Sequence, residues 1–158
     1  MYNKVNSVLY VGNNQNYKND FGLNKVILRK TIRIKSYLEA SDYLLNTSPS
    51  IDIIFIDEII NNIEGTTFFK MLRQFKRFES IVFILISDFQ LLSKSNHKKI
   101  KENGVDEVLN STFSFTEILP RLNFLIEYRK LPKIKKNELK LTTQYKISPL
   151  KRVFDILI

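Results

Sequence analysis

The chain has 158 residues, enough for one domain with a sizeable apolar core, and its 44% hydrophobic and 26% charged residues exclude disordered, collagen-like and low-complexity proteins. It has no Cys and a single His, His97 in a Lys-rich stretch, which excludes disulfides and thiolate metal sites and argues against a His-based metal site or catalytic triad. The net charge is +9, and nine basic residues against two acidic ones from position 129 onward place +7 of it in the C-terminal part, with +2 on residues 1–128.

Apolar and polar segments alternate along the first half of the chain. Residues 5–11 (VNSVLYV) and 51–56 (IDIIFI) are short, apolar and rich in β-branched side chains, so both predict buried strands, and residues 31–35 predict a further strand. The polar residues 14–30 predict a loop with one short helix. A short helix is also expected at 37–45, with an apolar face made of Tyr37, Leu38, Leu44 and Leu45.

A helix and a strand follow Asp57, which comes directly after the second of the two clearest strands. Residues 64–78 predict an amphipathic helix with Phe68, Leu72 and Phe75 on one side. Residues 81–86 (IVFILI) predict another buried strand, which is followed by Ser87.

The last predicted elements are two helices around a short strand. Residues 93–103 predict a polar helix that stops at Gly104, and 105–109 predict the last strand. Ser114 is a candidate N-cap with Glu117 three residues on, which is the pattern of a capping box. The helix that follows has an apolar face consisting of Phe115, Ile118, Leu119, Leu122, Leu125 and Ile126.

Strands that alternate with helices predict an α/β fold with a parallel sheet covered on both faces. The strands are continuous apolar runs, as expected when both faces are buried. Five strands within 128 residues predict a flavodoxin-like, doubly wound, five-stranded sheet. In such sheets ligands bind at the carboxyl ends of the strands, which here carry Gly12, Asn13, Asp57, Ser87 and Ser111.

Several of these residues have the order and spacing of a known family. Asp57 follows a buried strand, Gly65 comes eight residues later, and Ser87 ends the next strand. Gly104-Val105-Asp106 and Phe113 then surround the last strand. In these features residues 5 to about 128 resemble the receiver domain of bacterial response regulators. The resemblance implies that Asp57 matches the phosphoacceptor.

The same comparison shows departures at the positions that carry receiver chemistry. Receivers place an acidic pair after the first strand, where this chain has Gly12 and Asn13, and a Lys after the last strand, where it has Ser111 followed by Thr112. The aromatic switch position is Val108, and the loop 58–62 lacks the usual Pro. Aspartate phosphorylation needs Mg²⁺ held by carboxylates and a cation on the phosphoryl group.

We therefore expect a pseudo-receiver, with no catalytic residue, no metal and no cofactor. Its vestigial phosphoacceptor pocket consists of Asp57, Ser87, Asn13 and Ser111. In this interpretation Asp57 is a strand-end carboxylate that accepts backbone N–H groups in a loop. The alternative is a stand-alone, phospho-accepting response-regulator receiver of two-component signalling, which predicts Mg²⁺-dependent labelling of Asp57.

The C-terminal residues carry a second resemblance. Lys151-Arg152, Phe154 and Asp155, followed by Ile-Leu-Ile, are similar to the start of the membrane segment in bacterial sugar transferases that move a sugar phosphate onto a polyprenyl phosphate. Basic residues beside a membrane segment favour the cytoplasmic side and contribute about 1 kcal/mol each on anionic lipid. Two other interpretations are an amphipathic helix packed on the domain and a nucleic-acid-binding tail. The tail lacks aromatic residues at stacking intervals, so no nucleic-acid partner is expected.

Together these patterns predict a receiver-like domain at 1–128, a basic linker at 129–150 and the start of a truncated membrane segment at 151–158. The expected function is that of a non-catalytic regulatory domain of a membrane sugar transferase in polysaccharide biosynthesis. The expected partners are the catalytic region of the same chain, the cytoplasmic surface of the inner membrane and a possible second copy. No apolar run reaches ~18 residues and Met1–Asn6 has no signal-peptide pattern, so the fragment itself is expected in the cytoplasm.

Overall fold

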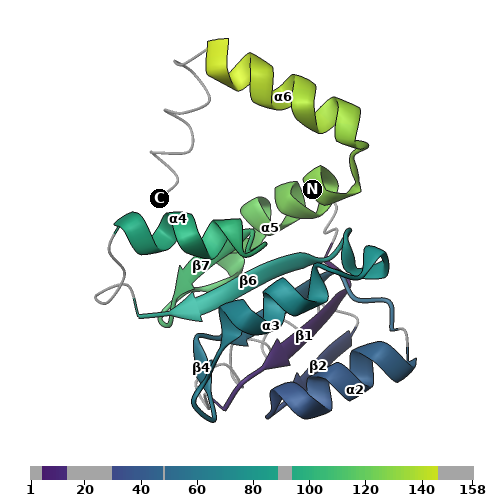
Figure 1. Cartoon of the computed structure of the whole chain (residues 1–158), viewed down its shortest axis with the longest axis vertical. Coiled ribbons are helices and arrows are strands. Elements are labelled where there is room, and N and C mark those ends of the chain that lie inside the picture. Colours follow the sequence, from purple (N-terminus) through teal and green to yellow (C-terminus); the bar gives the residue numbers. More distant parts are fainter. Residues whose placement is uncertain (1–4, 14–29, 48, 89–93, 146–158) are drawn as a thin grey trace.

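Five parallel strands form the centre of the fold in the computed structural model, which describes residues 5–13, 30–47, 49–88 and 94–145 (Figure 1). The strand order β2-β1-β3-β6-β7 is that of a flavodoxin-like sheet, which confirms the predicted fold class. The strands are β1 (Ser7–Val11), β2 (Lys30–Ile34), β3 (Ile53–Asp57), β6 (Val82–Ser87) and β7 (Glu107–Asn110). All four pairings between them are parallel, so their carboxyl ends lie at one edge of the sheet.

Helices cover both faces of the sheet. The side chains of α2 (Tyr37–Thr47), α3 (Gly65–Leu72) and α4 (Lys94–Glu102) contribute to one apolar core, and those of α5 (Phe115–Lys130) contribute to the other. Strand β3 serves both cores because successive strand side chains point to opposite faces: Ile54 and Ile56 lie in the first core, and Ile53 and Phe55 in the second. This two-sided burial is the reason that the strand sequences are continuously apolar.

The helix predicted at 64–78 is shorter than expected. It ends at Leu72, and a 3-10 turn at Lys76–Phe78 follows it. The chain bends here around the Arg73 guanidinium, which donates to the carbonyls of Phe78 and Ile81. Phe75 therefore leaves the apolar face and is 39% exposed.

Two further expectations about helices were wrong in detail. Leu38 was predicted on the buried face of its helix, but it is 82% exposed because Tyr37, Ala40 and Leu44 form that face. Ser114 is the N-cap residue of α5 as predicted, but the capping box does not form. The Ser114 hydroxyl lies 2.9 Å from the Thr116 hydroxyl instead.

A small hairpin follows Asp57 and was not predicted. Strands β4 (Ile59–Ile60) and β5 (Ile63–Glu64) pair antiparallel, and Asn61 and Asn62 form the turn with φ of 51° and 63°. Two consecutive left-handed residues are typical of a type I′ hairpin turn, in which Asn is tolerated.

The chain beyond 128 contains helical structure within the range predicted to be a linker. Helix α5 continues to Lys130, and α6 (Lys133–Tyr145) lies beyond it, at the end of the molecule opposite α2 (Figure 1). No helix among the described residues is both long and apolar enough to cross a membrane. The short helix predicted within 14–30 and the membrane-segment residues Lys151, Arg152, Phe154 and Asp155 lie outside the described residues.

Candidate functional site

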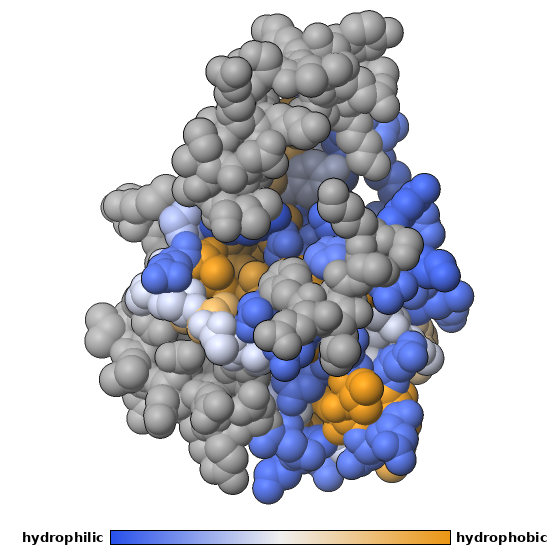
Figure 2. Space-filling model, turned by 90° about the vertical axis from the view of Figure 1, so that its left-hand side faces the viewer, coloured by the Kyte–Doolittle hydropathy of each residue, from blue (hydrophilic) through white to orange (hydrophobic). Residues whose placement is uncertain are grey.

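The predicted site residues lie at the carboxyl edge of the sheet. Figure 2 views the molecule from the side to which the strands of Figure 1 point, and the described part of this face is mostly hydrophilic with two separate hydrophobic areas. Asp57, Ser87 and Ser111 line a common hollow of about 220 Å³, together with Glu58 and Asp88. Asn13 does not line this hollow; it reaches Asp57 through its backbone N–H, 3.1 Å from Asp57 Oδ2.

The carboxylate of Asp57 is held by a side chain that the sequence did not identify. The Tyr10 hydroxyl donates to Asp57 Oδ2 at 2.8 Å, and Tyr10 is only 2% exposed. Asn13 N–H donates to the same oxygen. The backbone N–H bond agrees with the expectation of a strand-end aspartate, but the buried phenol adds a second, fixed donor.

Gly12 provides the space for this contact. A Cβ atom at position 12 would lie 2.2 Å from Asp57 Oδ2 and 2.4 Å from the Tyr10 hydroxyl oxygen, closer than any real Cβ contact. Any side chain at this position would therefore displace Tyr10, Asp57 or both. The Tyr10–Asp57 hydrogen bond therefore requires glycine at position 12, where receivers have an acid.

A second tyrosine, Tyr37, contacts the backbone of Asp57. The Tyr37 hydroxyl donates to the backbone carbonyl of Asp57 at 3.2 Å, and its ring stacks on Phe68 at a centroid distance of 5.0 Å. Burial, followed by the negative charge of Asp57, raises the pKa of Tyr37 well above its usual value. Tyr37 is therefore a neutral hydrogen-bond donor at any physiological pH.

The two serines of the predicted pocket have other partners. Ser87 is 3% exposed, and its hydroxyl donates to Glu58 Oε2 at 2.6 Å. The Ser111 hydroxyl donates to Asn110 Oδ1 at 3.4 Å. The structure thus brings Asp57, Ser87 and Ser111 to one hollow, in which each of the two serines donates to a neighbouring side chain.

Tyr10, Tyr37 and Glu58 are the site residues that sequence reasoning missed. Tyr10 has the only side-chain hydroxyl in the apolar run 8–11 of β1. A buried Tyr usually needs a hydrogen-bond partner for this hydroxyl. That signal was present, but it does not say which carboxylate is the partner.

Receiver chemistry implies Mg²⁺, and the donor set here does not fit it. Mg²⁺ prefers several oxygen ligands in octahedral geometry. Of the matching positions, Gly12 has no side chain and Asn13 is not a carboxylate, while Asp57 Oδ2 already accepts two protein donors. Among the described residues no group of three or more His, Asp or Glu side chains is arranged to hold a metal ion.

Comparison with solved structures identifies the architecture. The receiver domain of a Francisella response regulator is 25% identical, with a TM-score of 0.60 over 79% of this chain and 99% of that one. This chain has the receiver fold. A signal receiver domain of a histidine kinase from Syntrophus aciditrophicus is 16% identical, with a TM-score of 0.64 over 81% of this chain and 95% of that one. A two-component response regulator from Clostridium difficile is 13% identical, with a TM-score of 0.65 over 80% and 99%.

No family model and no curated protein matches the chain. The receiver fold therefore rests on the structural likeness, together with the positions of Asp57 and Ser87 at the ends of adjacent strands. Gly65 also has a structural reason to be glycine in this fold, because a Cβ there would lie 2.8 Å from the Asp57 carbonyl oxygen.

Proposed function

We propose that this chain is a receiver-type regulatory domain of a bacterial signalling or membrane protein, and that it acts through contacts rather than through phosphorylation of Asp57. The observation that carries the proposal is the hydrogen bond from Tyr10 to Asp57 Oδ2 at 2.8 Å, made possible by Gly12. The phenol reaches the carboxylate from β1, the strand after which receivers place their acidic pair. The position of the receiver Lys is Ser111, so this position supplies no cation for a phosphoryl group.

The second candidate is a phospho-accepting response-regulator receiver. It is supported by the place of Asp57 at the carboxyl end of the central strand β3, and by the solved receivers to which the chain is similar. Asp57, Ser87 and Ser111 also share one hollow. This candidate requires that Asp57 remain reactive despite its two donors.

Labelling with acetyl phosphate at saturating Mg²⁺ separates the two candidates. We expect no phosphoryl group on the wild-type chain by intact-protein mass spectrometry, because the receiver positions of the acidic pair and the lysine are Gly12, Asn13 and Ser111. Labelling of the wild type that disappears in Asp57→Asn would overturn the proposal in favour of the second candidate.

A gain-of-function variant provides the positive control. Tyr10→Phe removes the phenol, Asn13→Asp adds one carboxylate of the receiver pair and Ser111→Lys adds the cation next to Asp57. We expect this variant to accept a phosphoryl group and to lose it when Asp57→Asn is added. Far-UV circular dichroism checks that each variant is folded.

We further propose that the domain is attached to a membrane sugar transferase. It is supported by the order of Lys151, Arg152, Phe154 and Asp155 and by the basic residues that precede them. In that setting the domain's partners are the catalytic region of the same chain, the cytoplasmic face of the inner membrane and a possible second copy. Binding of the full chain to anionic lipid vesicles tests the proposed membrane attachment.

A further inference from the structure

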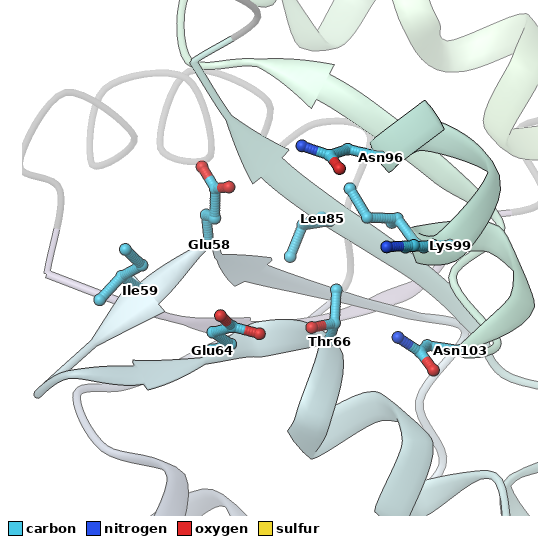
Figure 3. A pocket seen from close by; sticks show the side chains of 9 residues that line it. Glu58, Ile59, Glu64, Thr66, Leu85, Asn96, Lys99 and Asn103 are labelled. Carbon is cyan, nitrogen blue, oxygen red and sulfur yellow. The ribbon is translucent and has the colours of Figure 1, made fainter. Parts of the chain in front are cut away.

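A second hollow lies next to the Asp57 site, between the β4–β5 hairpin and α4 (Figure 3). Its volume is about 350 Å³, which is at the low end of the range for small-molecule sites. Leu85 and Ile100, both buried, contribute apolar surface to it, and Thr66 contributes a hydroxyl. The hollow therefore suits a compact molecule that has both apolar and polar parts.

The charged side chains of this hollow lie on opposite sides. Glu58 and Glu64 line the hairpin side, and Lys99 lines the α4 side with the amides Asn96 and Asn103 (Figure 3). No ion pair joins Lys99 to a carboxylate among the described residues, and the ion pairs that the structure does contain lie elsewhere. One wall of the hollow is thus acidic, and the other is basic and rich in amides. The opposite charges face each other across the hollow without forming an ion pair.

We propose that this hollow binds a small zwitterion of the free amino acid class. Its ammonium would lie toward Glu58 and Glu64, and its carboxylate toward Lys99 and the side-chain amides, while its side chain would contact Leu85. A simple anion would meet two carboxylates, and a simple cation would meet the Lys99 ammonium, so separated charges on one molecule fit this hollow best.

The position of Glu58 gives such a ligand a route to the Asp57 site. Glu58 lines both hollows, and its Oε2 accepts the Ser87 hydroxyl at 2.6 Å. An ammonium on Glu58 competes with Ser87 for this carboxylate, so that occupancy changes the surroundings of Asp57. This role rests on the proposed function, in which contacts rather than phosphorylation carry the signal, whereas binding itself is measured independently of it.

Two-dimensional NMR of the ¹⁵N-labelled full chain, titrated with the standard amino acids, tests the inference. We expect at least one amino acid to shift amide signals of the hairpin 59–64 and of α4 in a saturable manner. Its N-acetyl derivative lacks the ammonium and its decarboxylated amine lacks the carboxylate, so both should bind at least about tenfold more weakly.

Charge-removing variants locate the site. Glu64→Gln and Lys99→Met should each weaken binding by about tenfold or more, since each removes one charged hydrogen-bonding group. Glu102→Gln and Lys101→Met are matched controls on α4 that do not line the hollow, and they should leave the affinity unchanged. Binding that is equally sensitive in the controls, or no saturable shift with any amino acid, would overturn the inference. Neither result depends on whether Asp57 can be labelled.

Discussion

Asp106 joins two arginines in a partly buried ion-pair network. Its side chain is 7% exposed and pairs with Arg73 at 2.8 Å through Oδ2 and with Arg129 through Oδ1. Oδ2 also accepts the Phe83 N–H at 2.8 Å, which connects the network to β6. Arg73 donates to the Gly104 carbonyl and lies 3.6 Å from the centre of the Phe83 ring. Burial lowers the pKa of Arg73 to about 10, against the opposing effect of Asp106, so the guanidinium stays charged at neutral pH.

Asp106→Asn should destabilise the protein. The substitution leaves two partly buried guanidinium groups without their carboxylate. The loss of one partner of a fully buried ion pair costs about 3 kcal/mol or more, and partial exposure reduces this cost to about 1–3 kcal/mol. Urea denaturation measures the change in the free energy of unfolding. The control Glu39→Gln, on the exposed side of α2, should change it by no more than about 0.5 kcal/mol. Equal effects of the two substitutions would show that the network contributes little.

Tyr37 should make the stability depend on alkaline pH. Its pKa is raised in the folded state above the ordinary value of 10.0, so the unfolded chain releases this proton first. The stabilisation is complete below pH 10.0 and is lost progressively as the pH rises above it. Tyr37→Phe should therefore show a smaller decrease of the free energy of unfolding over this range. Parallel pH profiles of the two proteins would contradict the assignment of this titration to Tyr37.

At the scale of elements, α5 contains a residue that is unfavourable in a helix. Pro120 lies within the helix Phe115–Lys130, where it has no N–H to donate to the carbonyl of Thr116. Because Pro120 is exposed, its ring contributes little to the core. The helix forms nevertheless because Phe115, Leu122 and Ile126 are each only 1% exposed against the sheet. Tertiary burial here outweighs an unfavourable local residue.

Pro120→Ala should stabilise the protein by about 1–3 kcal/mol, because it restores a helical donor and removes the steric conflict of the ring. Thermal unfolding followed by circular dichroism measures the rise in Tm. Lys130→Ala, at the C-terminal end of the same helix, should change stability by no more than about 0.5 kcal/mol. A decrease of Tm in Pro120→Ala would mean that the proline, and not the helix around it, is required.

At the scale of the whole molecule, charge is gathered at the junction of α5 and α6. We call this surface the basic face. It lines a hollow of about 440 Å³, and its basic residues are Lys76, Arg129, Lys130, Lys133 and Lys136. One acidic residue, Glu79, also lines this hollow. The Lys136 ammonium donates to the Arg129 carbonyl at 3.0 Å, and burial, followed by the charge of Arg129, lowers the pKa of Lys136. The first turn of α6 contains no acid to offset these cations at the positive end of the helix dipole.

The basic face should bind anionic lipid, as the proposed membrane attachment requires. We expect the full chain to pellet with phosphatidylglycerol vesicles in a salt-dependent manner. The triple variant Lys76→Gln, Lys130→Gln, Lys133→Gln should bind roughly a hundredfold more weakly, at about 1 kcal/mol for each charge. The matched control neutralises three lysines outside the basic face, Lys70, Lys98 and Lys101, and should bind nearly as well as the wild type.

A truncation after Leu150 tests the C-terminal residues separately. Removal of residues 151–158 should weaken vesicle binding, because Phe154, Ile156, Leu157 and Ile158 would no longer insert among the lipids. Unchanged binding by the truncated chain would mean that the interpretation of 151–158 as the start of a membrane segment is wrong.

Local patterns were sufficient for the five strands of the parallel sheet and for the edge at which the site lies. Continuous apolar runs such as 51–56 and 81–86 predict buried parallel strands, since such runs are satisfied only between two layers of helices. Once the strands are parallel, Asp57 and Ser87 must come to the same edge of the sheet. The stop of α4 at Gly104 was predictable for a local reason too, since its φ of 90° suits glycine.

Where the predictions failed, contacts between distant segments decided the outcome. The helix predicted at 64–78 ends at Leu72 because Arg73 has acceptors in the following turn and at Gly104, 31 residues away. The hairpin after Asp57 depends on two Asn residues in left-handed conformation, which helical or strand periodicity does not reveal.

The order of apolar and polar segments in the amino-acid sequence thus determined the parallel α/β sheet and the place of Asp57 at its carboxyl edge. The resemblance to receivers then marked Gly12, Asn13 and Ser111 as departures from the receiver pattern. Only the tertiary structure decided what holds Asp57. Tyr10 and Tyr37 lie 47 and 20 residues from it in the chain. Their hydroxyl groups reach it because β1 pairs with β3 and the side chains of α2 pack in the same core as those of β3. A buried hydroxyl must find a partner, but which partner it finds depends on which elements the two cores bring together.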